Sequence, residues 1–550
     1  MVKKPPTANL STVRPISHYK NQIMKSIQIR GNYQNVNPKK IPVLISPSSE
    51  FTLKSFFKPV ITPFSVLLLA ITLCCSLNSS ASEIYIGKSE ANISPTLPVA
   101  LMGQFNLRIA HMAATPITAN VVALESREGA KSLDAAIFVS CDLVYIPTPL
   151  LSMIRIEVSK QLPGFDGNKI ILNATHTHTA PVLEDNLDES SFLYKIPGGV
   201  SPVSAYRALF VKNVADAVVK AWNSRSPGSV SWGLNRAAIP YNRRASYANN
   251  TTTMYGKTNV PEFRNLEGYE DHDINSLFFW NKEGKLIAMS IDVACPAQEV
   301  EGRSEVNADY WHPVRMALKE KFGDDLTVLG WIGAAGDQSP HIMYRKAADE
   351  RMLKLSNKTR MDDIAARVVS AVEESYKTVK DDQYRNVKLV HKVEKIKLPV
   401  RVITEKEYEE AKIVRDEAAA LIAKDPKAAD QQYAKMTWFG DVLKRYEKQK
   451  ANPEYETEIH VLRIGDAVIC TNQFELFTDY GIRIQARSRA LQTFVVQLAG
   501  PGTYLATEKA IRGGGYSAVC QSNIVGSEGG QILVDHTVKL IDEMWAKKPN

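Results

Sequence analysis

Two histidines separated by a single residue are the first candidates for chemistry in this chain. His176 and His178 lie in the segment ATHTHTAP, directly after the apolar run KIILNA, in a sequence with only ten histidines. Side chains i and i+2 of a β-strand point to the same face, so both imidazoles would share a face if the strand extended that far. Imidazole is the commonest protein ligand for zinc-like metals. The alternative is one exposed histidine and one that is hydrogen-bonded in the core.

A serine at the end of an apolar run is the second candidate. In GWIGAAGDQSPH, the run leads into Gly-Ala-Ala-Gly, then Asp337, Ser339 and Pro340. Small residues allow a ligand to approach the backbone closely, and a serine at a strand exit is well placed as a nucleophile. The alternative is a glycine-rich turn in which Ser339 caps a helix that begins at Pro340.

One acidic and two aromatic residues near the end of the chain complete the candidates. Glu475 lies between Phe474 and Leu476, after the strand-like run DAVICT. A carboxylate among apolar side chains is costly unless it is paired or bound to a metal. Tyr504 and Tyr516 lie in the glycine-rich segment GPGTYLATEKAIRGGGYSA. Taken alone, each tyrosine is expected to serve packing rather than chemistry.

In this order, the four segments resemble the neutral, non-lysosomal ceramidase family, whose hallmark reads THTHSGP. The double histidine and GDQSP carry the resemblance, and the FEL and YLAT segments support it by their order. The resemblance spans residues 83–537. It implies a zinc-dependent amidase that cleaves the amide of ceramide into a fatty acid and a sphingoid base.

The resemblance also implies the metal ligands, with one departure. The family has a second histidine ligand in a strand-end His-Pro, fourteen residues before an aspartate; counting back from Asp309 reaches Cys295 instead. Because thiolate is a good zinc ligand, Cys295 could replace the histidine. His312 is the alternative imidazole, and a third option is that metal binding is lost and Cys295 is a buried thiol. The expected ligand set is His176, Cys295, Glu475 and Tyr504.

The remaining roles follow from the same resemblance. His178 would face the substrate as general base and then as acid to the leaving amine. Arg243, in NRRASY, and Tyr516 would stabilise the oxyanion, with Arg244 as the alternative arginine. Ser339 would either orient a water or attack as nucleophile, and the residues leave both open. Asp142 and Asp337 are expected to orient loops at strand ends.

The elements that must position these residues alternate between strand and helix patterns. Apolar, β-branched runs predict strands, and longer amphipathic runs, such as 204–224 and 360–379, predict helices. This mixture predicts an α/β fold, a mixed β-sheet core with flanking helices in a single large catalytic domain, residues 83–550. Residues 404–450 are rich in Ala, Glu and Lys and predict an inserted, exposed helical hairpin broken near Asp425 and Pro426.

The positive net charge does not indicate a nucleic-acid partner. Of the net charge of +8, all lies in residues 1–82, where ten lysines and arginines face a single acid, Glu50. The apolar run PVITPFSVLLLAITLCCSL follows Lys54 and Lys58, and NSSAS follows it. This pattern predicts a secretory signal or an uncleaved anchor. We therefore expect an exported protein that is periplasmic, extracellular or anchored in a membrane through this leader.

Two departures from the family make ceramide less certain as the substrate than amide hydrolysis is as the reaction. The segment TAPVLEDNLDE is acidic and bulky where the family has glycines, and we expect no room for the immunoglobulin-like C-terminal domain of ceramidases. The expected substrate is ceramide or a related N-acyl lipid, with peripheral membrane contact. One alternative is a hydrolase of acylated glycans or other small N-acyl compounds. The other is an exported binding protein whose catalytic site has decayed.

Overall fold

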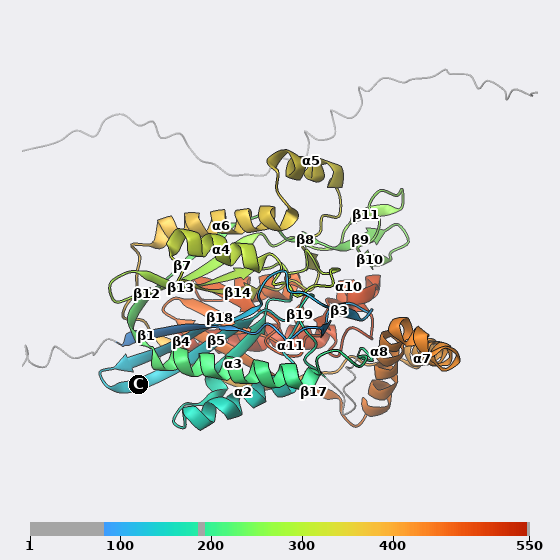
Figure 1. The fold of residues 1–550 in the computed structure, drawn as a ribbon, viewed down its shortest axis with the longest axis horizontal. Helices are drawn as coiled ribbons and strands as arrows, with labels where there is room; N and C mark the ends of the chain where they lie inside the picture. Colours follow the sequence, from blue (N-terminus) through green and yellow to red (C-terminus); the bar gives the residue numbers. More distant parts are fainter. Residues whose placement is uncertain (1–81, 185–192, 547–550) are drawn as a thin grey trace, which may run out of the picture. The chain divides into compact units, whose positions relative to one another are not determined.

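The computed structural model describes residues 82–184 and 193–546. The leader predicted over residues 1–82 lies outside these ranges except for Ser82, as does most of the acidic segment after Leu183. Among the helices of the described ranges, none is long and apolar enough to span a membrane. Figure 1 shows the fold coloured along the sequence.

A large mixed sheet forms the centre of the fold. Its strands are, in spatial order, β14 (Thr327–Ile332), β13 (Leu286–Val293), β12 (Asp273–Asn281), β7 (Ser226–Arg236), β1 (Glu83–Asn92), β4 (Thr118–Glu128), β5 (Lys131–Cys141) and β6 (Ile170–Ala174). The pairs β13–β14 and β5–β6 at its two edges are parallel, and the inner pairs are antiparallel. Many of the apolar, β-branched runs in the sequence are thus strands of this sheet.

A second, smaller sheet packs against one face of the first. It consists of β16 (Leu389–Pro399), β17 (Glu454–Ile464), β18 (Ala467–Thr471) and β20 (Gln492–Val496). Buried side chains from both sheets, including Ile86, Phe138, Trp331, Leu462 and Phe494, form one core between them. Burial of such side chains contributes about 25 cal/mol per Å² of apolar surface, so this interface is a main source of stability.

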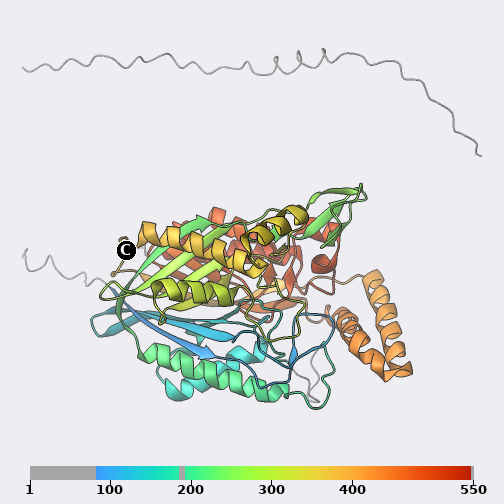
Figure 2. The same cartoon turned by 45° about the horizontal axis from the view of Figure 1, so that its top comes forward.

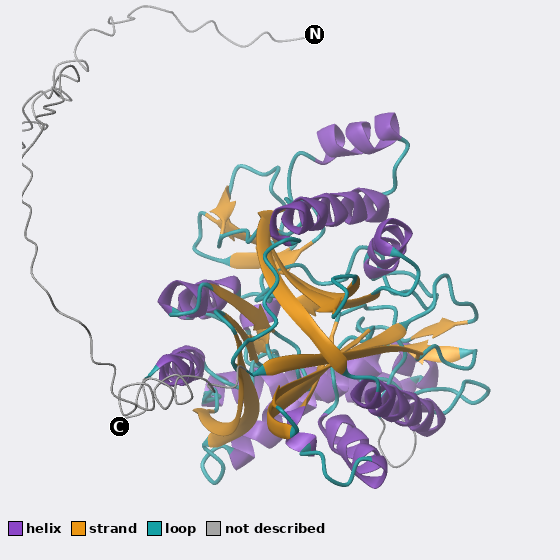
Figure 3. Ribbon diagram, turned by 90° about the vertical axis from the view of Figure 1, so that its left-hand side faces the viewer, coloured by secondary structure: helices purple, strands orange, loops and turns teal. Residues whose placement is uncertain are grey.

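Helices cover the outer faces of both sheets, as Figure 3 shows in purple against the orange strands. α2 (Thr148–Gln161) and α3 (Val203–Asn223) pack on one part of the large sheet, and α4 (Trp311–Phe322) and α6 (Arg360–Val379) pack on another. α9 (Thr478–Arg487) and α11 (Ser527–Trp545) cover the small sheet. The predicted fold class, a mixed sheet core with flanking helices, is confirmed.

Short elements connect these layers. They are β2 (Val99–Leu101), β3 (Arg108–Ala110), β8 (Tyr241–Asn242), β9 (Arg244–Tyr247), β10 (Thr252–Met254), β11 (Phe263–Leu266), β15 (Gln338–Ser339), β19 (Glu475–Leu476), β21 (Tyr504–Leu505), α5 (Lys346–Ser356) and α10 (Glu508–Gly513), with 3-10 turns at 167–169, 426–428 and 516–518. Several of the candidate residues lie on these two- to four-residue strands, which carry little periodicity in the sequence.

Two antiparallel helices occupy the segment predicted as a helical hairpin. α7 (Glu405–Lys424) begins with a capping box between Thr404 and Glu407 and ends before Pro426, and α8 (Ala429–Lys448) follows. Figure 2 shows the pair in orange beside the sheets. Arg445 of α8 donates hydrogen bonds to the carbonyls of Cys520 and Asn523. The base of the hairpin is therefore fixed to the segment that follows Tyr516.

The large sheet curls so that its two edges meet. β14, at one edge, also contacts β4, β5 and β6 near the other edge. The Ser140 hydroxyl and the Asn173 amide both donate to the carbonyl oxygen of Gly330, at 2.6 and 3.2 Å. The loops after β6, β13 and β14 come together there, because the Ala297 N–H donates to the carbonyl oxygen of Thr175 at 3.2 Å and the Gly333 N–H donates to that of Val293 at 3.0 Å. Open α/β sheets bind ligands at such carboxyl ends of parallel strands.

A buried histidine pair joins the small sheet to β5. His391 Nε2 lies 3.0 Å from His460 Nδ1, and His391 Nδ1 lies 3.0 Å from the carbonyl oxygen of Ala135. Burial, with His460 and Lys169 nearby, holds the pKa of His391 well below its usual value. Burial also lowers the pKa of His460, although Glu458 opposes this effect. Burial therefore favours the neutral form of both rings, whereas the Glu458 carboxylate, 3.0 Å from His460 Nε2, favours a proton on the pair.

This pair predicts a loss of stability in mild acid. Below about pH 6.5, unfolded histidines bind protons that the folded pair does not. The contribution of the pair to the free energy of unfolding is therefore fully present above that pH. The free energy of unfolding should fall by up to about 1.4 kcal/mol per pH unit for each histidine as the pH drops toward 5. Urea denaturation between pH 5 and 7.5 measures this slope. His391→Gln should flatten it, and the exposed control His111→Gln should not; equal slopes in all three proteins would contradict the assignment.

Candidate active site

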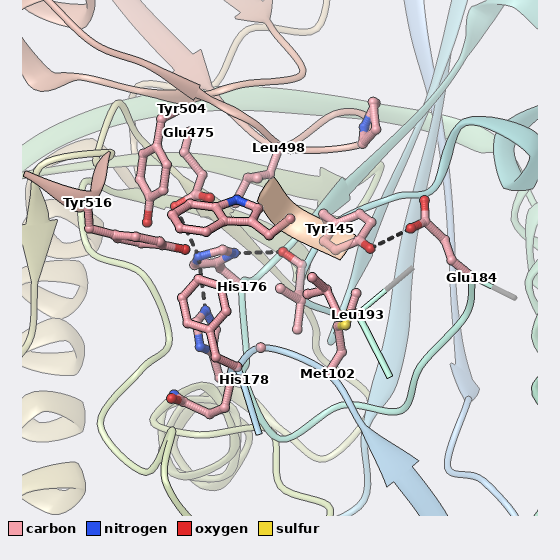
Figure 4. A pocket seen from close by; sticks show the side chains of 17 residues that line it. Met102, Tyr145, His176, His178, Glu184, Leu193, Glu475, Leu498, Tyr504 and Tyr516 are labelled. Atoms are coloured by element: carbon pink, nitrogen blue, oxygen red, sulfur yellow. Dashed lines mark hydrogen bonds and ion pairs between the residues drawn. The ribbon is translucent and has the colours of Figure 1, made fainter. Parts of the chain in front are cut away.

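The two histidines meet through a turn and not through a strand. β6 ends at Ala174, and His176 has a left-handed backbone with φ of 64°. The expectation that a continued strand would place both rings on one face is therefore wrong. The turn nevertheless brings His176 Nε2 to 3.2 Å from His178 Nε2 (Figure 4). Left-handed conformations of residues other than glycine are costly and cluster at functional sites.

The surroundings of His176 fix which of its nitrogens faces the pocket. Its Nδ1 donates to the carbonyl oxygen of Val144 at 2.7 Å, because a carbonyl can only accept. In a neutral ring the lone pair is then on Nε2, which points toward Glu475 Oε2 at 3.4 Å. An imidazole held by a backbone carbonyl on one nitrogen, with a free lone pair on the other, is the usual arrangement of a metal-binding histidine.

Glu475 and Tyr504 are neighbours on paired strands. β19 and β21 are parallel and place the two residues side by side, and the Tyr504 hydroxyl is hydrogen-bonded to the Glu475 carboxylate. Burial alone would raise the pKa of Glu475, but His176 and Arg243 hold it below its usual value. Gly336 makes the close packing possible, because a Cβ there would lie 2.3 Å from the carbonyl oxygen of Glu475. Glu475 is thus a largely buried carboxylate, with 13% of its side chain exposed, that faces an imidazole lone pair.

Arg243, rather than Arg244, points into this group. Its guanidinium donates to the Tyr504 hydroxyl at 3.1 Å and to Gln298 Oε1 at 3.0 Å, and it lies 3.9 Å from Glu475 Oε2. Arg244 instead forms a two-contact ion pair with Glu267 and donates to Ser517. Arg243 therefore bears on the site, and Arg244 holds the loop that carries Tyr516.

Ser339 lies behind the site and not on the pocket wall. It is fully buried on β15, and its hydroxyl oxygen accepts hydrogen bonds from the Tyr255 hydroxyl at 2.9 Å and the backbone N–H of His341 at 3.0 Å. Tyr255 in turn accepts from Arg243 at 3.3 Å. The serine is thus connected to the site through Tyr255 and Arg243. No helix begins at Pro340, so the helix-cap alternative is wrong.

The structure does not bring Cys295 to this group. After β13 the chain turns tightly, and the thiol packs in the core with its nearest polar contacts at 3.8–3.9 Å, to the carbonyls of Ile239 and Pro296. Burial, with Asp309 and Glu299 nearby, raises the pKa of this thiol well above its usual value. His312 is on α4, beside Arg315 and Asp142, and does not line the pocket either.

Three side chains of this group, those of His176, Glu475 and Tyr504, could hold a metal ion together. In the described ranges, no group of three or more His, Cys, Asp or Glu side chains is arranged to hold a metal, so the pair His176 and Glu475 could do so only with a further donor such as the Tyr504 phenol. Ligand atoms about 2.0–2.1 Å from a tetrahedral zinc lie about 3.3 Å apart. His176 Nε2 and Glu475 Oε2 are 3.4 Å apart, which matches. Catalytic zinc sites have three protein ligands and one open position, which is the number of donors that His176, Glu475 and Tyr504 could supply.

These residues line one end of a cavity of about 270 Å³. Aromatic side chains surround its wall: Tyr516 packs 5.6 Å from Tyr504, and Phe105 and Trp438 pack against Tyr516 at 5.5 and 5.7 Å between ring centres. Trp438 comes from α8, so the helical hairpin contributes to the pocket. At the other end, the Tyr145 hydroxyl donates to Glu184 at 2.8 Å (Figure 4).

The surroundings of His178 favour its neutral form. Burial, with His176, Arg108 and Arg243 nearby, holds its pKa well below the usual value for histidine. Its Nε2 lies 2.7 Å from Gln298 Nε2, and its Nδ1 lies 3.4 Å from Glu301 Oε2. A neutral imidazole can accept a proton, so the ring is available as a base.

Comparison with solved structures identifies the fold that carries this site. The neutral ceramidase from Pseudomonas aeruginosa superimposes with a TM-score of 0.59 at 14% identity, covering 85% of this chain and 76% of that one. The chain shares the neutral ceramidase fold. A structure described as ceramidase complexed with C2 matches similarly, with a TM-score of 0.57 at 14% identity over 85% of this chain and 77% of that one. No protein-family model matches the sequence, and no curated protein matches it.

Several residues of this candidate site escaped the sequence analysis. They are Gln298, Glu301, Tyr255 and Trp438, which reach His178, Arg243 or the pocket wall. Gln298 and Glu301 lie in the stretch that follows Cys295, where the departure from the family drew attention to the thiol alone. Trp438 is the one tryptophan in a segment of mostly charged and small residues, and that contrast was a usable signal.

We expect the substitution Gly103→Ala, which adds a single methyl group, to have a strong effect on this site. Its φ is +107°, and a Cβ there would lie 2.6 Å from His178 Cγ and 2.9 Å from its Cα. Gly103→Ala should therefore displace His178 and lower kcat/KM by about 100-fold. The matched control is Gly129→Ala, which has a similar left-handed backbone but no atom within 4 Å of the added Cβ. A Gly103→Ala enzyme as active as the Gly129→Ala enzyme would show that His178 is not at the reaction centre.

Proposed function

We propose that this protein is a zinc-dependent hydrolase of linear amides, of the neutral ceramidase type, which releases a carboxylic acid and an amine from an N-acyl substrate. The observation that carries the proposal is the convergence of His176 Nε2, Glu475 and Tyr504 beside His178, within a cavity of the neutral ceramidase fold. Export through the leader, and contact with a membrane, belong to the same proposal.

The ligands proposed for zinc are His176, Glu475 and Tyr504. When bound, zinc would polarise the scissile carbonyl or lower the pKa of a water. His178 accepts a proton on Nε2 and later returns it to the leaving amine. Burial keeps the pKa of Tyr516 above its usual value, so its hydroxyl remains protonated and can donate to the developing oxyanion. One such donor contributes about 3 kcal/mol.

Arg243 and Ser339 support this chemistry from behind the pocket wall. Arg243 donates to Tyr504 and is the positive charge nearest Glu475, so it holds both proposed ligands in place. Ser339 accepts a hydrogen bond from Tyr255, which accepts from Arg243. We therefore assign Ser339 a positioning role through Tyr255 rather than a role as nucleophile.

The far end of the pocket favours a second candidate substrate. The cavity is at the small end of the range for ligand pockets, about 300–1,000 Å³. Its far end carries a carboxyl, Glu184, hydrogen-bonded to Tyr145, and burial raises the pKa of Glu184. A polar end suits a substrate with hydroxyl groups better than two long alkyl chains. An acylated glycan or another small N-acyl compound is therefore the alternative to ceramide.

The test combines metal content with hydrolysis by the purified full-length chain. We expect about one zinc per chain by elemental analysis, and release of fatty acid from a short-chain ceramide or of acetate from an N-acetylated sugar. Activity on one substrate alone would choose between the two candidates. Because Cys295 lies apart from the proposed ligands, Cys295→Ser should keep its zinc. Loss of zinc in that variant would support the four-ligand set that includes Cys295. A wild-type chain with neither zinc nor activity would support the alternative that the protein binds a ligand without catalysis.

A further inference from the structure

Two polar residues after β13 face His178 from opposite sides of its ring. Glu301 Oε2 lies 3.4 Å from His178 Nδ1, a buried nitrogen with no hydrogen-bond partner among the described residues. Gln298 Nε2 lies 2.7 Å from the other nitrogen, Nε2. Neither residue belongs to the motifs that indicated this site, and the mechanism above does not use them.

Gln298 determines where the proton of the neutral ring is. Its Oε1 accepts from Arg243 Nη1, and a guanidinium can only donate, so the orientation of the amide is fixed. The amide nitrogen, a donor, therefore faces His178 Nε2. The 2.7 Å contact with this donor and the carboxylate at Nδ1 both place the lone pair on Nε2 and the proton on Nδ1, toward Glu301. They oppose the longer contact, 3.2 Å, with His176 Nε2, which also carries a lone pair in its neutral ring. The same contacts thus specify both the tautomer and the carboxylate that faces it.

A buried arginine fixes Glu301 and His178 relative to one another. The Arg108 guanidinium donates to the backbone carbonyls of His178 and Met102 at 2.6 and 2.7 Å, and to those of Glu301 and Arg303 at 2.6 and 2.7 Å. Gln104 Nε2 also donates to Glu301 Oε2 at 3.3 Å. One side chain therefore joins the two loops that carry the imidazole and the carboxylate.

We propose that Glu301 and Gln298 are the positioning residues of His178: Gln298 selects the tautomer with the lone pair on Nε2, and Glu301 holds the ring and stabilises the imidazolium that forms. This inference rests on the proposed function. The contact between Glu301 and Nδ1 is long, and such contacts commonly tighten when substrate binds.

The proton transfer follows from this arrangement. A water O–H takes the place of the Gln298 amide at His178 Nε2, and its oxygen attacks the scissile carbonyl carbon while its proton moves to Nε2. The ring then carries a positive charge opposite the Glu301 carboxylate, and Glu301 is not itself protonated. When the C–N bond breaks, its electron pair remains on the nitrogen, which takes the proton back from Nε2. The ring returns to its starting state, and the products are the acid and the amine.

Kinetics of Glu301 variants test the first half of the proposal. Glu301→Gln should lower kcat by about 10- to 100-fold with KM within about twofold, because the ring is misplaced and the substrate site is not. Glu301→Asp keeps the charge and should recover part of the loss. The matched control is Glu305→Gln, which breaks an ion pair with Arg303 in the same loop and should stay within about twofold of wild type. Glu301→Gln kinetics equal to those of the control would overturn the proposal.

The tautomer itself can be measured without activity. In the full chain with ¹⁵N-labelled histidine, the His178 signals, assigned by loss in His178→Ala, should show the proton on Nδ1. Gln298→Leu should convert them to a mixture of tautomers or to Nε2–H. Wild-type signals with the proton on Nε2 would refute the assignment. If the tautomer is as expected but no N-acyl substrate is cleaved, the pairing stands and the proposed function fails. If the wild type cleaves an N-acyl substrate and Glu301→Gln cleaves it equally well, the proposed function stands and the positioning role of Glu301 fails.

Discussion

Glu475→Gln is expected to remove zinc from the protein and to lower kcat/KM by about 1,000-fold, or about 4 kcal/mol of transition-state stabilisation. The amide has nearly the same shape as the carboxylate but no negative charge, and in this buried position it would face the lone pair of His176 Nε2 at 3.4 Å. It would also leave the Arg243 guanidinium without its nearest carboxylate. Elemental analysis and hydrolysis of the same preparation measure both effects.

The control for this variant is another glutamate in an ion pair with a histidine. Glu394 accepts from His536 at 2.7 Å, outside the pocket and partly exposed. Glu394→Gln should keep zinc and activity within about twofold, since exposed ion pairs contribute little. If Glu475→Gln behaved like Glu394→Gln, the proposed site would be wrong whatever the substrate.

Arg315→Leu is expected to destabilise the protein by about 3–5 kcal/mol. Arg315 donates to both carboxylate oxygens of Asp142, at 2.7 and 3.0 Å, and Asp142 is fully buried. Removing the guanidinium leaves a buried charge with only neutral donors, Thr118 and Thr175. Urea denaturation at neutral pH gives the free energy of unfolding. Because Thr175 precedes His176, the remaining folded protein should also lose activity.

Two comparisons separate this effect from a general loss of charge. Arg367 forms an exposed ion pair with Asp363 on α6, so Arg367→Leu should change the free energy of unfolding by less than about 1 kcal/mol. The double variant Arg315→Leu with Asp142→Asn should recover part of the loss, because the uncompensated charge is gone. If the Arg315→Leu protein were as stable as the Arg367→Leu protein, groups other than Arg315 would have to stabilise the buried negative charge of Asp142.

The strands and helices with a clear period could be predicted from the sequence, and the loops that make the site could not. β5, β6, β13 and β14 read as strands because their apolar residues are continuous, as expected for buried parallel strands. The turn at His176 has no such signal, since a left-handed histidine is selected by its surroundings and not by its neighbours in sequence. The two histidines do meet, but through a turn and not through the continued strand that was expected.

Spacing along the chain also failed to describe the surroundings of the proposed metal ligands. Counting residues led to Cys295, but the number of residues in a loop does not determine which way a side chain points, and the tight turn after Val293 directs this thiol into the core. Gln298, three residues later, reaches His178 instead. Likewise, the charged composition of α7 and α8 indicated a solvated hairpin and concealed the inward-facing Trp438.

The meeting of the two edges of the large sheet has a consequence for how activity arises during folding. His176 follows β6 at one edge, the loop after β14 lies at the other, and Glu475 and Tyr504 come from a third region of the chain. Contacts between such distant segments form late, because loop-closure entropy must be overcome first. A fragment that lacks one of these regions, or an intermediate in which they have not yet met, holds at most two of the three proposed zinc donors together. Tight zinc binding would then report completed folding, and zinc would stabilise the native state alone by mass action.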